Sequence, residues 1–316
     1  MARYVTLATL SGFPLPLDGS TPPDRVTDIM IEHWRERLET VVHSRPDLIV
    51  LPEQCDRPSL KTYPRDLVEQ FYEHRGDRIL DFFASVAREH HTHIAYSGRR
   101  VDGPTRYNAT QIIDRNGDIA GTYDKCYLTE GEYERTGMTP GDGPRQIELD
   151  FGTVAPAICF DLNFEELLDD VAALRPDVVA FSSNFHGGYL QQHWAYTTQA
   201  YFVGAICPPS PSEIRDPFGI PVASSTNYRH EAVATVNLDR AVVHIDFNGV
   251  KFNDIRRAYG PDVRISDPGR VGSVLLTAER EGLSVDEVIE RFELVRFDDY
   301  FRRVRRYRRH RSGEDT

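Results

Sequence analysis

Asp47-Leu-Ile-Val-Leu-Pro-Glu53 is a short apolar run with the length of a buried strand, and it ends in a proline and a glutamate. We predict a helix on either side of this strand, because apolar residues recur near helical spacing in the segments before and after it. These helices are Asp24–His43 and Arg75–His90. Tyr4–Leu10 is predicted to form the first strand. Strands that alternate with segments of helical length are typical of an α/β fold, and we predict that class here.

The same alternation continues through the middle of the chain. Asn116-Gly117 predicts a tight hairpin turn because both residue types tolerate positive φ, and this hairpin leads directly to Lys125. The strands predicted in this part are His93–Arg99, Asn108–Asp114, Ile119–Tyr123, Thr153–Ile158, Val178–Ser182, Val222–Ser225 and Ala232–Asn237. The helices predicted in this part are Glu165–Leu174 and His193–Phe202.

The composition is that of an ordinary globular protein, with 40% hydrophobic and 27% charged residues in a chain of 316. The longest apolar runs are far shorter than the ~20 residues that a membrane-spanning helix needs, so we expect no membrane association. The N-terminus runs directly into a strand-like pattern without a long apolar leader, and we therefore expect a cytoplasmic protein. The four cysteines are widely spaced and form no Cys-x-x-Cys pair, which indicates free thiols.

The charge is unevenly distributed along the chain. The formal net charge is −12, although residues 302–311 hold seven arginines and no acid. Residues 1–301 form an acidic body, which disfavours nucleic-acid binding. The basic tail at residues 302–311 keeps such binding as an alternative. We predict a catalytic domain at residues 1–260 and an appended segment at residues 261–316. That segment has a predicted strand at Val271–Thr277 and a long predicted helix from about Ser284, where Ser284-Val-Asp-Glu287 has capping-box spacing.

Three reactive residues each follow directly on a strand-like run. They are Glu53, Lys125 and Cys159, and Lys125 is one of only three lysines in the chain. Because ligands of open α/β sheets bind at the carboxyl ends of strands, we expect the three side chains to meet in one pocket. A thiol beside a base and a cation is a strong nucleophile. Glu53 would take the thiol proton, and Lys125 with the backbone N–H of Phe160 would stabilise an oxyanion.

The motifs around these residues resemble those of the nitrilase, or carbon-nitrogen hydrolase, superfamily over roughly residues 3–260. They are Leu51-Pro52-Glu53, Tyr107-Asn108 through Asp114-Arg-Asn-Gly117 to Gly121-x-Tyr123-Asp-Lys125, and Ala157-Ile158-Cys159-Phe-Asp161-Leu-Asn163-Phe-Glu-Glu166. The resemblance implies a four-layer α-β-β-α sandwich and a reaction that needs neither a metal nor an organic cofactor. It also implies a homodimer or larger assembly, with the C-terminal segment and its basic tail in the subunit interface.

Many members of the superfamily carry a second catalytic glutamate shortly before a Pro-Gly-Asp turn. Glu134 lies six residues before Pro140-Gly141-Asp142, and we predict that it fills this role. Glu130 and Glu132 are the alternatives, since they lie closer to Lys125 in the chain.

The residues after Cys159 bear on the substrate. Carbamoyl amino-acid hydrolases of the superfamily have an arginine shortly after the cysteine, whereas this chain has Asn163, which resembles the simple-amide branch. Phe160, Asn163, Asn184 and His186 resemble pocket residues of the family, and we predict that they bind the substrate. The cluster His90-His91-x-His93 lies at a helix–strand junction without an apparent fourth ligand, and we expect no metal site.

The predicted reaction is hydrolysis of a small amide through a thioester on Cys159. The alternatives with the same three residues are hydrolysis of an N-carbamoyl compound, hydrolysis of a nitrile, and acyl transfer to an amine. An alternative of another class is a non-catalytic binding protein that uses the basic tail at residues 302–311 to contact nucleic acid or an acidic protein.

Overall fold

A computed structural model describes residues 2–12 and 14–312. By its internal contacts the chain forms two compact units, of which Thr6–Thr235 is the larger. The smaller unit joins the first residues of the chain to the segment that starts at Val236. The division by contacts thus falls at 235, whereas the sequence pattern places a boundary at 260; the functional assignment of the two segments stays a prediction.

The first sheet has six strands in the order β12-β1-β2-β3-β4-β5. Its strands are β1 (Tyr4–Leu10), β2 (Leu48–Val50), β3 (His93–Asp102), β4 (Thr105–Ile113), β5 (Ile119–Asp124) and β12 (Glu231–Asn237). β2 pairs in parallel with both β1 and β3, and β4 and β5 extend the sheet as antiparallel strands. Two of the three reactive residues, Glu53 and Lys125, follow strands of this sheet.

The second sheet also has six strands, in the order β11-β10-β9-β8-β7-β6. Its strands are β6 (Ile147–Leu149), β7 (Gly152–Ile158), β8 (Val178–Ser183), β9 (Tyr201–Ile206), β10 (Glu213–Arg215) and β11 (Pro221–Ser224). β7, β8 and β9 are parallel neighbours, and Cys159 follows β7 directly.

One element of this sheet corrects the sequence prediction of a helix at His193–Phe202. The helix α6 spans Tyr189–Thr198, and Tyr201-Phe202 already belongs to β9. Gln199 ends the helix in a left-handed conformation, with φ of 53°. The apolar run that follows is buried at every position, so tertiary packing decides between helix and strand where periodicity alone does not.

The central strands are buried on both faces, because each lies between the other sheet and a helical layer. In β2, Ile49 packs among the helices, while Leu48 and Val50 point to the opposite face and are equally buried. β8 repeats the pattern with Phe181, which packs toward α5 (Glu165–Leu174) and α6. Such near-continuous apolar runs are typical of parallel strands that are covered on both sides.

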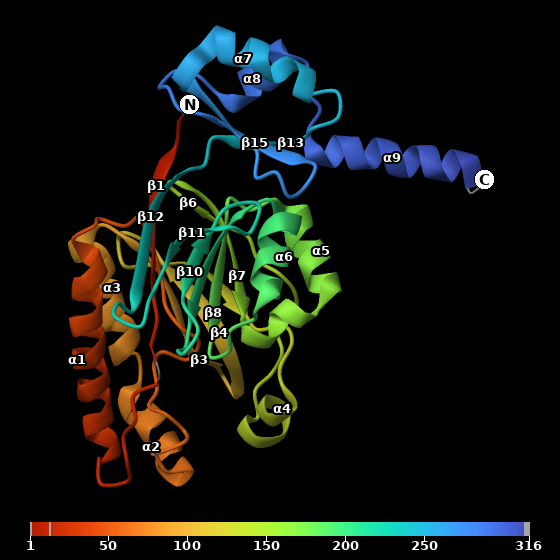
Figure 1. Ribbon diagram of the computed structural model, residues 1–316. Coiled ribbons are helices and arrows are strands. Elements are labelled where there is room, and N and C mark those ends of the chain that lie inside the picture. The colour runs from red at the N-terminus through yellow and green to blue at the C-terminus, as the bar shows by residue number, and fades with distance from the viewer. Residues whose placement is uncertain (1, 13, 313–316) are drawn as a thin grey trace. The chain divides into compact units, whose positions relative to one another are not determined.

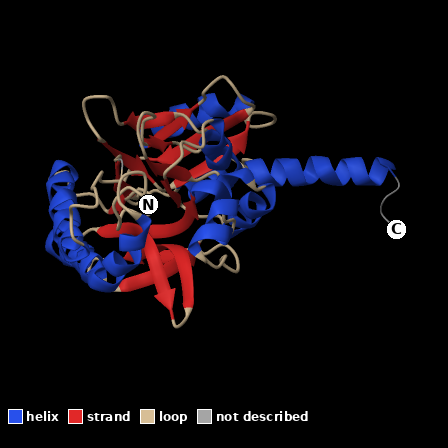
Figure 2. Ribbon diagram, turned by 90° about the horizontal axis from the view of Figure 1, so that it is seen from below, coloured by secondary structure: helices blue, strands red, loops and turns tan. Residues whose placement is uncertain are grey.

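Helices cover the outer faces of the two sheets. α1 (Pro23–Val42) and α3 (Arg78–His90) lie outside the first sheet next to α2 (Arg65–Arg75), and α5 and α6 lie outside the second (Figure 1). In the view turned by 90° about the horizontal axis, the strands of the larger unit again lie between its helices (Figure 2). The predicted α/β class and α-β-β-α layering are therefore confirmed for this unit. Within residues 2–12 and 14–312 no helix combines the length and apolar character needed to cross a membrane.

The smaller unit contains a three-stranded sheet in the order β13-β15-β14. Its elements are β13 (Arg240–His244), η2 (Gly249–Lys251), α7 (Phe252–Tyr259), η3 (Gly260–Asp262), β14 (Val263–Ser266), β15 (Ser273–Ala278), α8 (Val285–Arg291) and α9 (Phe297–Ser312). The predicted capping box at the start of α8 is present.

The single long helix predicted from Ser284 is wrong, because α8 and α9 are separate. Glu293 has φ of 48°, and the side chain of Asn248 holds the backbone N–H and carbonyl of Val295 at 2.9 and 2.8 Å. These contacts fix the chain between the two helices in a non-helical conformation, which no local sequence pattern records.

Candidate active site

Glu53 lies three residues beyond the end of β2 and is buried, with 5% of its surface exposed. Its Oε1 accepts hydrogen bonds from the Asn108 amide at 2.8 Å and from Lys125 Nζ at 3.0 Å. Its Oε2 accepts the backbone N–H of Asn184 at 3.0 Å. Burial raises the pKa of this carboxyl group, but the charge of Lys125 and these hydrogen bonds outweigh it, so the pKa lies below its usual value. Glu53 is therefore a carboxylate at neutral pH.

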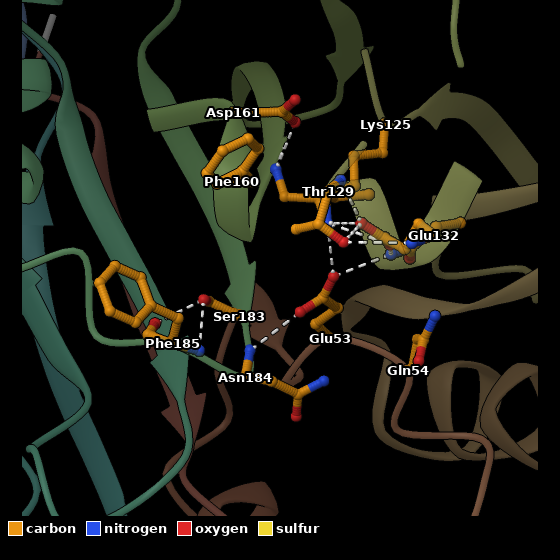
Figure 3. Close-up of polar contacts among 12 residues, drawn as sticks. Glu53, Gln54, Lys125, Thr129, Glu132, Phe160, Asp161, Ser183, Asn184 and Phe185 are labelled. Atoms are coloured by element: carbon orange, nitrogen blue, oxygen red, sulfur yellow. Dashed lines mark hydrogen bonds and ion pairs between the residues drawn. The ribbon is translucent and has the colours of Figure 1, made fainter. Parts of the chain in front are cut away.

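Lys125 follows β5 directly, and its side chain is almost fully buried. The ammonium group lies between two carboxylates, 3.0 Å from Glu53 and 2.9 Å from Glu132 (Figure 3). Burial would lower the pKa of Lys125, but the negative charges around it raise that pKa above its usual value. A buried ammonium with two carboxylate partners stays protonated and fixed in position.

The backbone of Lys125 is held as firmly as its side chain. Its N–H donates to the Asn108 carbonyl at 2.9 Å, and its carbonyl accepts the Gly141 N–H at 2.8 Å. A Cβ added to Gly141 would lie 2.1 Å from the Asp124 carbonyl oxygen. The Pro-Gly-Asp turn therefore requires glycine at this position in order to approach the lysine segment.

The second carboxylate at Lys125 belongs to Glu132, and this corrects the prediction of Glu134. Glu132 is the third residue of α4 (Glu130–Thr136), where it forms a capping box with Thr129. Glu134 is exposed, because residues two apart on a helix point in different directions. The spacing Thr129-x-x-Glu132 is itself a capping-box signal, and it would have favoured Glu132 had the segment been recognised as the start of a helix.

Cys159 begins the short 3-10 turn η1 (Cys159–Asn163) directly after β7. Its φ of 48° is in the left-handed region, which is uncommon for a residue other than glycine and costs about 1 kcal/mol or more. Burial and the charge of Glu53 raise the pKa of the Cys159 thiol. The charge of Lys125 and a hydrogen bond with Ser183 lower this pKa by less, so that it lies above its usual value. The resting sulfur is therefore a neutral thiol with a carboxylate close enough to accept its proton.

Asp161 connects the turn that carries Cys159 to the segment that carries Lys125. Its fully buried carboxylate accepts the Tyr123 hydroxyl at 2.7 Å, the Tyr127 N–H at 2.9 Å and the Ile158 N–H at 2.9 Å. Burial raises the pKa of Asp161 to about 6, against the effect of these donors. The three hydrogen bonds fix the position of the thiol relative to the ammonium group.

The predicted substrate-binding residues occupy different environments. Phe160 is exposed next to Cys159, and the Asn163 amide donates to the Phe160 carbonyl at 2.9 Å. Asn184 follows β8 and touches Glu53 through its backbone, as described above. His186 accepts the Gly188 N–H on Nδ1 at 3.1 Å, and the charged groups that act on its ring are Glu213 and Arg215.

Phe160 therefore adjoins the cluster of Glu53, Lys125 and Cys159 in the chain, and Asn184 adjoins it by direct contact, whereas Asn163 contacts Phe160. His186 lies beside charged residues of β10 instead, and within residues 2–12 and 14–312 no hydrogen bond or ion pair joins it to that cluster. The binding roles of all four remain predictions.

Asn108 is a site residue that the sequence reasoning did not identify. Its buried amide donates to Glu53 and to Glu132, both at 2.8 Å, and so holds the two carboxylates on either side of Lys125. The one available signal was its place in the lysine motif, at the first position of the predicted strand Asn108–Asp114.

No group of three or more histidine, cysteine or acidic side chains arranged to hold a metal occurs in the part of the chain that the structure describes. His93, from the histidine cluster, forms a hydrogen bond with Asp150 at 2.9 Å. The site is thus built from a carboxylate, an ammonium group and a thiol, which can supply a base, an electrostatic stabiliser and a nucleophile.

A family profile described as carbon-nitrogen hydrolase matches residues 27–244. The chain therefore belongs to the carbon-nitrogen hydrolase family, as its motifs predict.

The relatives include amidases. The chain is 23% identical over 258 residues to a chloroplastic omega-amidase of Arabidopsis thaliana, a match that covers 72% of this chain and 68% of that protein. It is 25% identical over 187 residues to the deaminated glutathione amidase of Homo sapiens, which covers 50% of this chain and 54% of that protein.

The fold is similar to that of an amidase from Nesterenkonia sp., with a TM-score of 0.62 and 17% identity over 81% of this chain and 96% of the other. The NitFhit protein of C. elegans gives a TM-score of 0.63 at 19% identity, over 83% of this chain and 65% of that one.

Proposed function

We propose that this protein hydrolyses small amides through a thioester on Cys159, with Glu53 as the general base. The observation that carries the proposal is the ionised, buried Glu53 in contact with Lys125, together with a thiol whose pKa responds to both charges. A neutral thiol with a carboxylate as proton acceptor is what attack on an uncharged amide requires.

The first half of the reaction forms the thioester. The Cys159 sulfur attacks the amide carbonyl carbon while its proton passes to Glu53, and the carbonyl oxygen becomes an oxyanion. When the oxyanion collapses, the carbon–nitrogen bond breaks, and the proton on Glu53 is transferred to the leaving nitrogen. Ammonia or an amine departs, and Glu53 is again a carboxylate.

The second half hydrolyses the thioester. Glu53 takes a proton from a water molecule, whose oxygen attacks the thioester carbon. When this second oxyanion collapses, the carbon–sulfur bond breaks, the thiol regains its proton from Glu53, and a carboxylic acid is released. Lys125 and the Phe160 N–H stabilise the oxyanion in both halves, because a fixed positive charge in a buried site acts without the reorganisation that water needs.

Intact-mass spectrometry during turnover tests this proposal. The protein would be mixed with a panel of short aliphatic amides, N-carbamoyl compounds and nitriles, and the products would be identified alongside the mass of the protein. We expect ammonia release from amides and a transient mass increase equal to the acyl group, located on Cys159 after digestion. Release of product from the nitriles or carbamoyl compounds alone, or an adduct on another residue, would contradict the proposal.

Glu132 and Glu134 offer a matched pair for the second glutamate. We expect Glu132→Gln to lower kcat/KM for the best amide by about 100-fold, because the substitution removes one of the two charges that hold Lys125. Glu134→Gln is expected to change kcat/KM less than about twofold, since that side chain is exposed. Steady-state kinetics of both variants, with thermal unfolding as a check of folding, measures the difference. Equal effects of the two substitutions would contradict the assignment.

A further inference from the structure

Asn108 is fixed in the first sheet, beside the residue that follows β5. On one side it is the partner of Arg99 in β3, and on the other its carbonyl accepts the Lys125 N–H at 2.9 Å. Its side chain is fully buried. The side-chain amide therefore has a defined position relative to Lys125.

The amide nitrogen of Asn108 donates to two carboxylates at once. Nδ2 donates to Glu53 Oε1 and to Glu132 Oε1, each at 2.8 Å. The opposite orientation of the amide would place its oxygen against two carboxylate oxygens, which repel it unless one of them is protonated. Nitrogen toward the glutamates is thus the orientation that two ionised glutamates require.

The oxygen of the same amide takes no part in this network. Among residues 2–12 and 14–312, no backbone or side-chain group donates to Asn108 Oδ1, which is buried. A side chain that only supported the fold would employ both ends of its amide, because buried polar atoms are normally hydrogen-bonded. The one-sided use indicates that the two donors are what the site needs.

The donors of the site fill both oxygens of Glu132. Its Oε1 accepts Asn108 and Lys125, and its Oε2 accepts Lys125 together with the N–H and the hydroxyl of Thr129. In Figure 3 the side chains of Lys125 and Thr129 surround this carboxylate. Since a carboxylate offers about four lone pairs, Glu132 has no position left for a proton.

Glu53 differs from Glu132 because one of its oxygens is only partly occupied. Its Oε1 accepts Asn108 and Lys125. Among the described residues, and apart from the thiol that it serves, Oε2 accepts one hydrogen bond, from the Asn184 N–H at 3.0 Å. The remaining lone pair of Oε2 is therefore the position that is open to a proton.

We infer that Asn108 is a positioning residue that directs the proton of the Cys159 thiol to Oε2 of Glu53, because its amide occupies Oε1. The inference rests on the proposed function. In the step that forms the thioester, the S–H bond breaks as the sulfur attacks, and the new O–H bond forms on Oε2. Oε1 meanwhile continues to accept Asn108 and Lys125. Without the amide, Oε1 has an open lone pair, and a proton bound there removes the base from the reaction.

The amide of Asn108 is a neutral donor among charged groups. The titratable groups around Glu53 are Lys125 after β5, Glu132 in α4, Cys159 in η1 and Cys207 after β9. Burial raises the pKa of Glu53, whereas Lys125 and the hydrogen bonds, including that of the Asn108 amide, lower it. Loss of the amide leaves the charges unchanged and raises this pKa, so that Glu53 becomes protonated, and inactive as a base, at a higher pH.

Two substitutions of Asn108 separate its donors from its shape. Asn108→Asp keeps the shape of the side chain but replaces the donors with oxygen, whereas Asn108→Leu removes the donors without adding a charge. We expect kcat/KM for the best amide to fall about 100-fold in Asn108→Asp and about 10-fold in Asn108→Leu, mainly through kcat. The acid limb of the pH profile of kcat/KM should move up by about one pH unit in Asn108→Leu.

Thr110→Val is the matched control. Thr110 is fully buried, lies two residues further along β4 and so on the same face, and its hydroxyl forms no hydrogen bond within the described part of the chain. We expect this variant to keep the rate and the pH profile of the wild type. Wild-type activity in Asn108→Asp, or an unmoved acid limb in Asn108→Leu, would overturn the inference.

A second measurement does not depend on turnover. Carbon-13 NMR of protein labelled at the glutamate carboxyl carbon follows the protonation of Glu53, whose resonance is identified by its loss in Glu53→Gln. We expect the midpoint of this titration to lie at higher pH in Asn108→Leu than in the wild type.

The two measurements distinguish failure of the inference from failure of the proposed function. A raised midpoint in a protein that hydrolyses no amide would refute the proposed function and leave the control of Glu53 by Asn108 standing. Amide hydrolysis with an unchanged midpoint would refute the inference alone. Thermal unfolding identifies a folding defect, and Asn108→Asp, which keeps the shape of the side chain, decides the outcome where Asn108→Leu does not fold.

Discussion

Replacing Cys159 with alanine is expected to lower amide turnover by at least about 1,000-fold, because no other group in the cluster can form the acyl intermediate. The alanine variant should keep its fold, since the ion pairs of Lys125 with Glu53 and Glu132 do not involve the sulfur. It should also show no mass increase with any amide. Rates from steady-state ammonia release and the intact mass measure the two effects.

Cys126 provides the matched control. It is a free thiol directly after Lys125 in the chain and is partly exposed, as Cys159 is. Cys126→Ala is expected to retain turnover and the acyl adduct. Substantial turnover in Cys159→Ala would show that the sulfur is not the nucleophile, whatever the effect of the control.

Replacing Glu53 with glutamine is expected to have opposite effects on turnover and on the thiol. Turnover should fall by about 100- to 10,000-fold, because the proton acceptor for both halves of the reaction is lost. The pKa of Cys159 should fall, because the charge of Glu53 raises it in the wild type, whereas Lys125, which lowers it, remains. The thiolate fraction at neutral pH should therefore rise while turnover falls.

The pH dependence of alkylation by iodoacetamide measures the second effect. The midpoint for Cys159 should lie at lower pH in Glu53→Gln than in the wild type. An unchanged or higher midpoint would show that the carboxylate does not control the thiol.

Local patterns in the sequence predicted the α/β class and most of the strands. They also predicted that Glu53, Lys125 and Cys159 lie at strand ends. This was feasible because short apolar runs bounded by turn residues are local signals, and residues such as Asn116-Gly117 specify a turn without reference to the rest of the chain. The two sheets of six strands confirm the layered class.

The predictions that failed depend on contacts between distant segments. Tyr201–Ile206 has no periodicity that distinguishes a buried strand from a helix, and its pairing with β8 decides the outcome. The break between α8 and α9 depends on Asn248, which lies far from Val295 in the chain. The choice of Glu132 over Glu134 follows from the direction of each side chain on α4, which is defined only once the start of that helix is known.

Local sequence patterns already specify which chemical groups the protein has and which strands carry them, because motifs and apolar runs are properties of neighbouring residues. Which of these groups meet depends on how the chain folds. Lys125 is stabilised between Glu53 and Glu132 because three separate segments converge on one buried charge. Charge balance in a buried site is a property of distances through space, and no pattern along the chain records it.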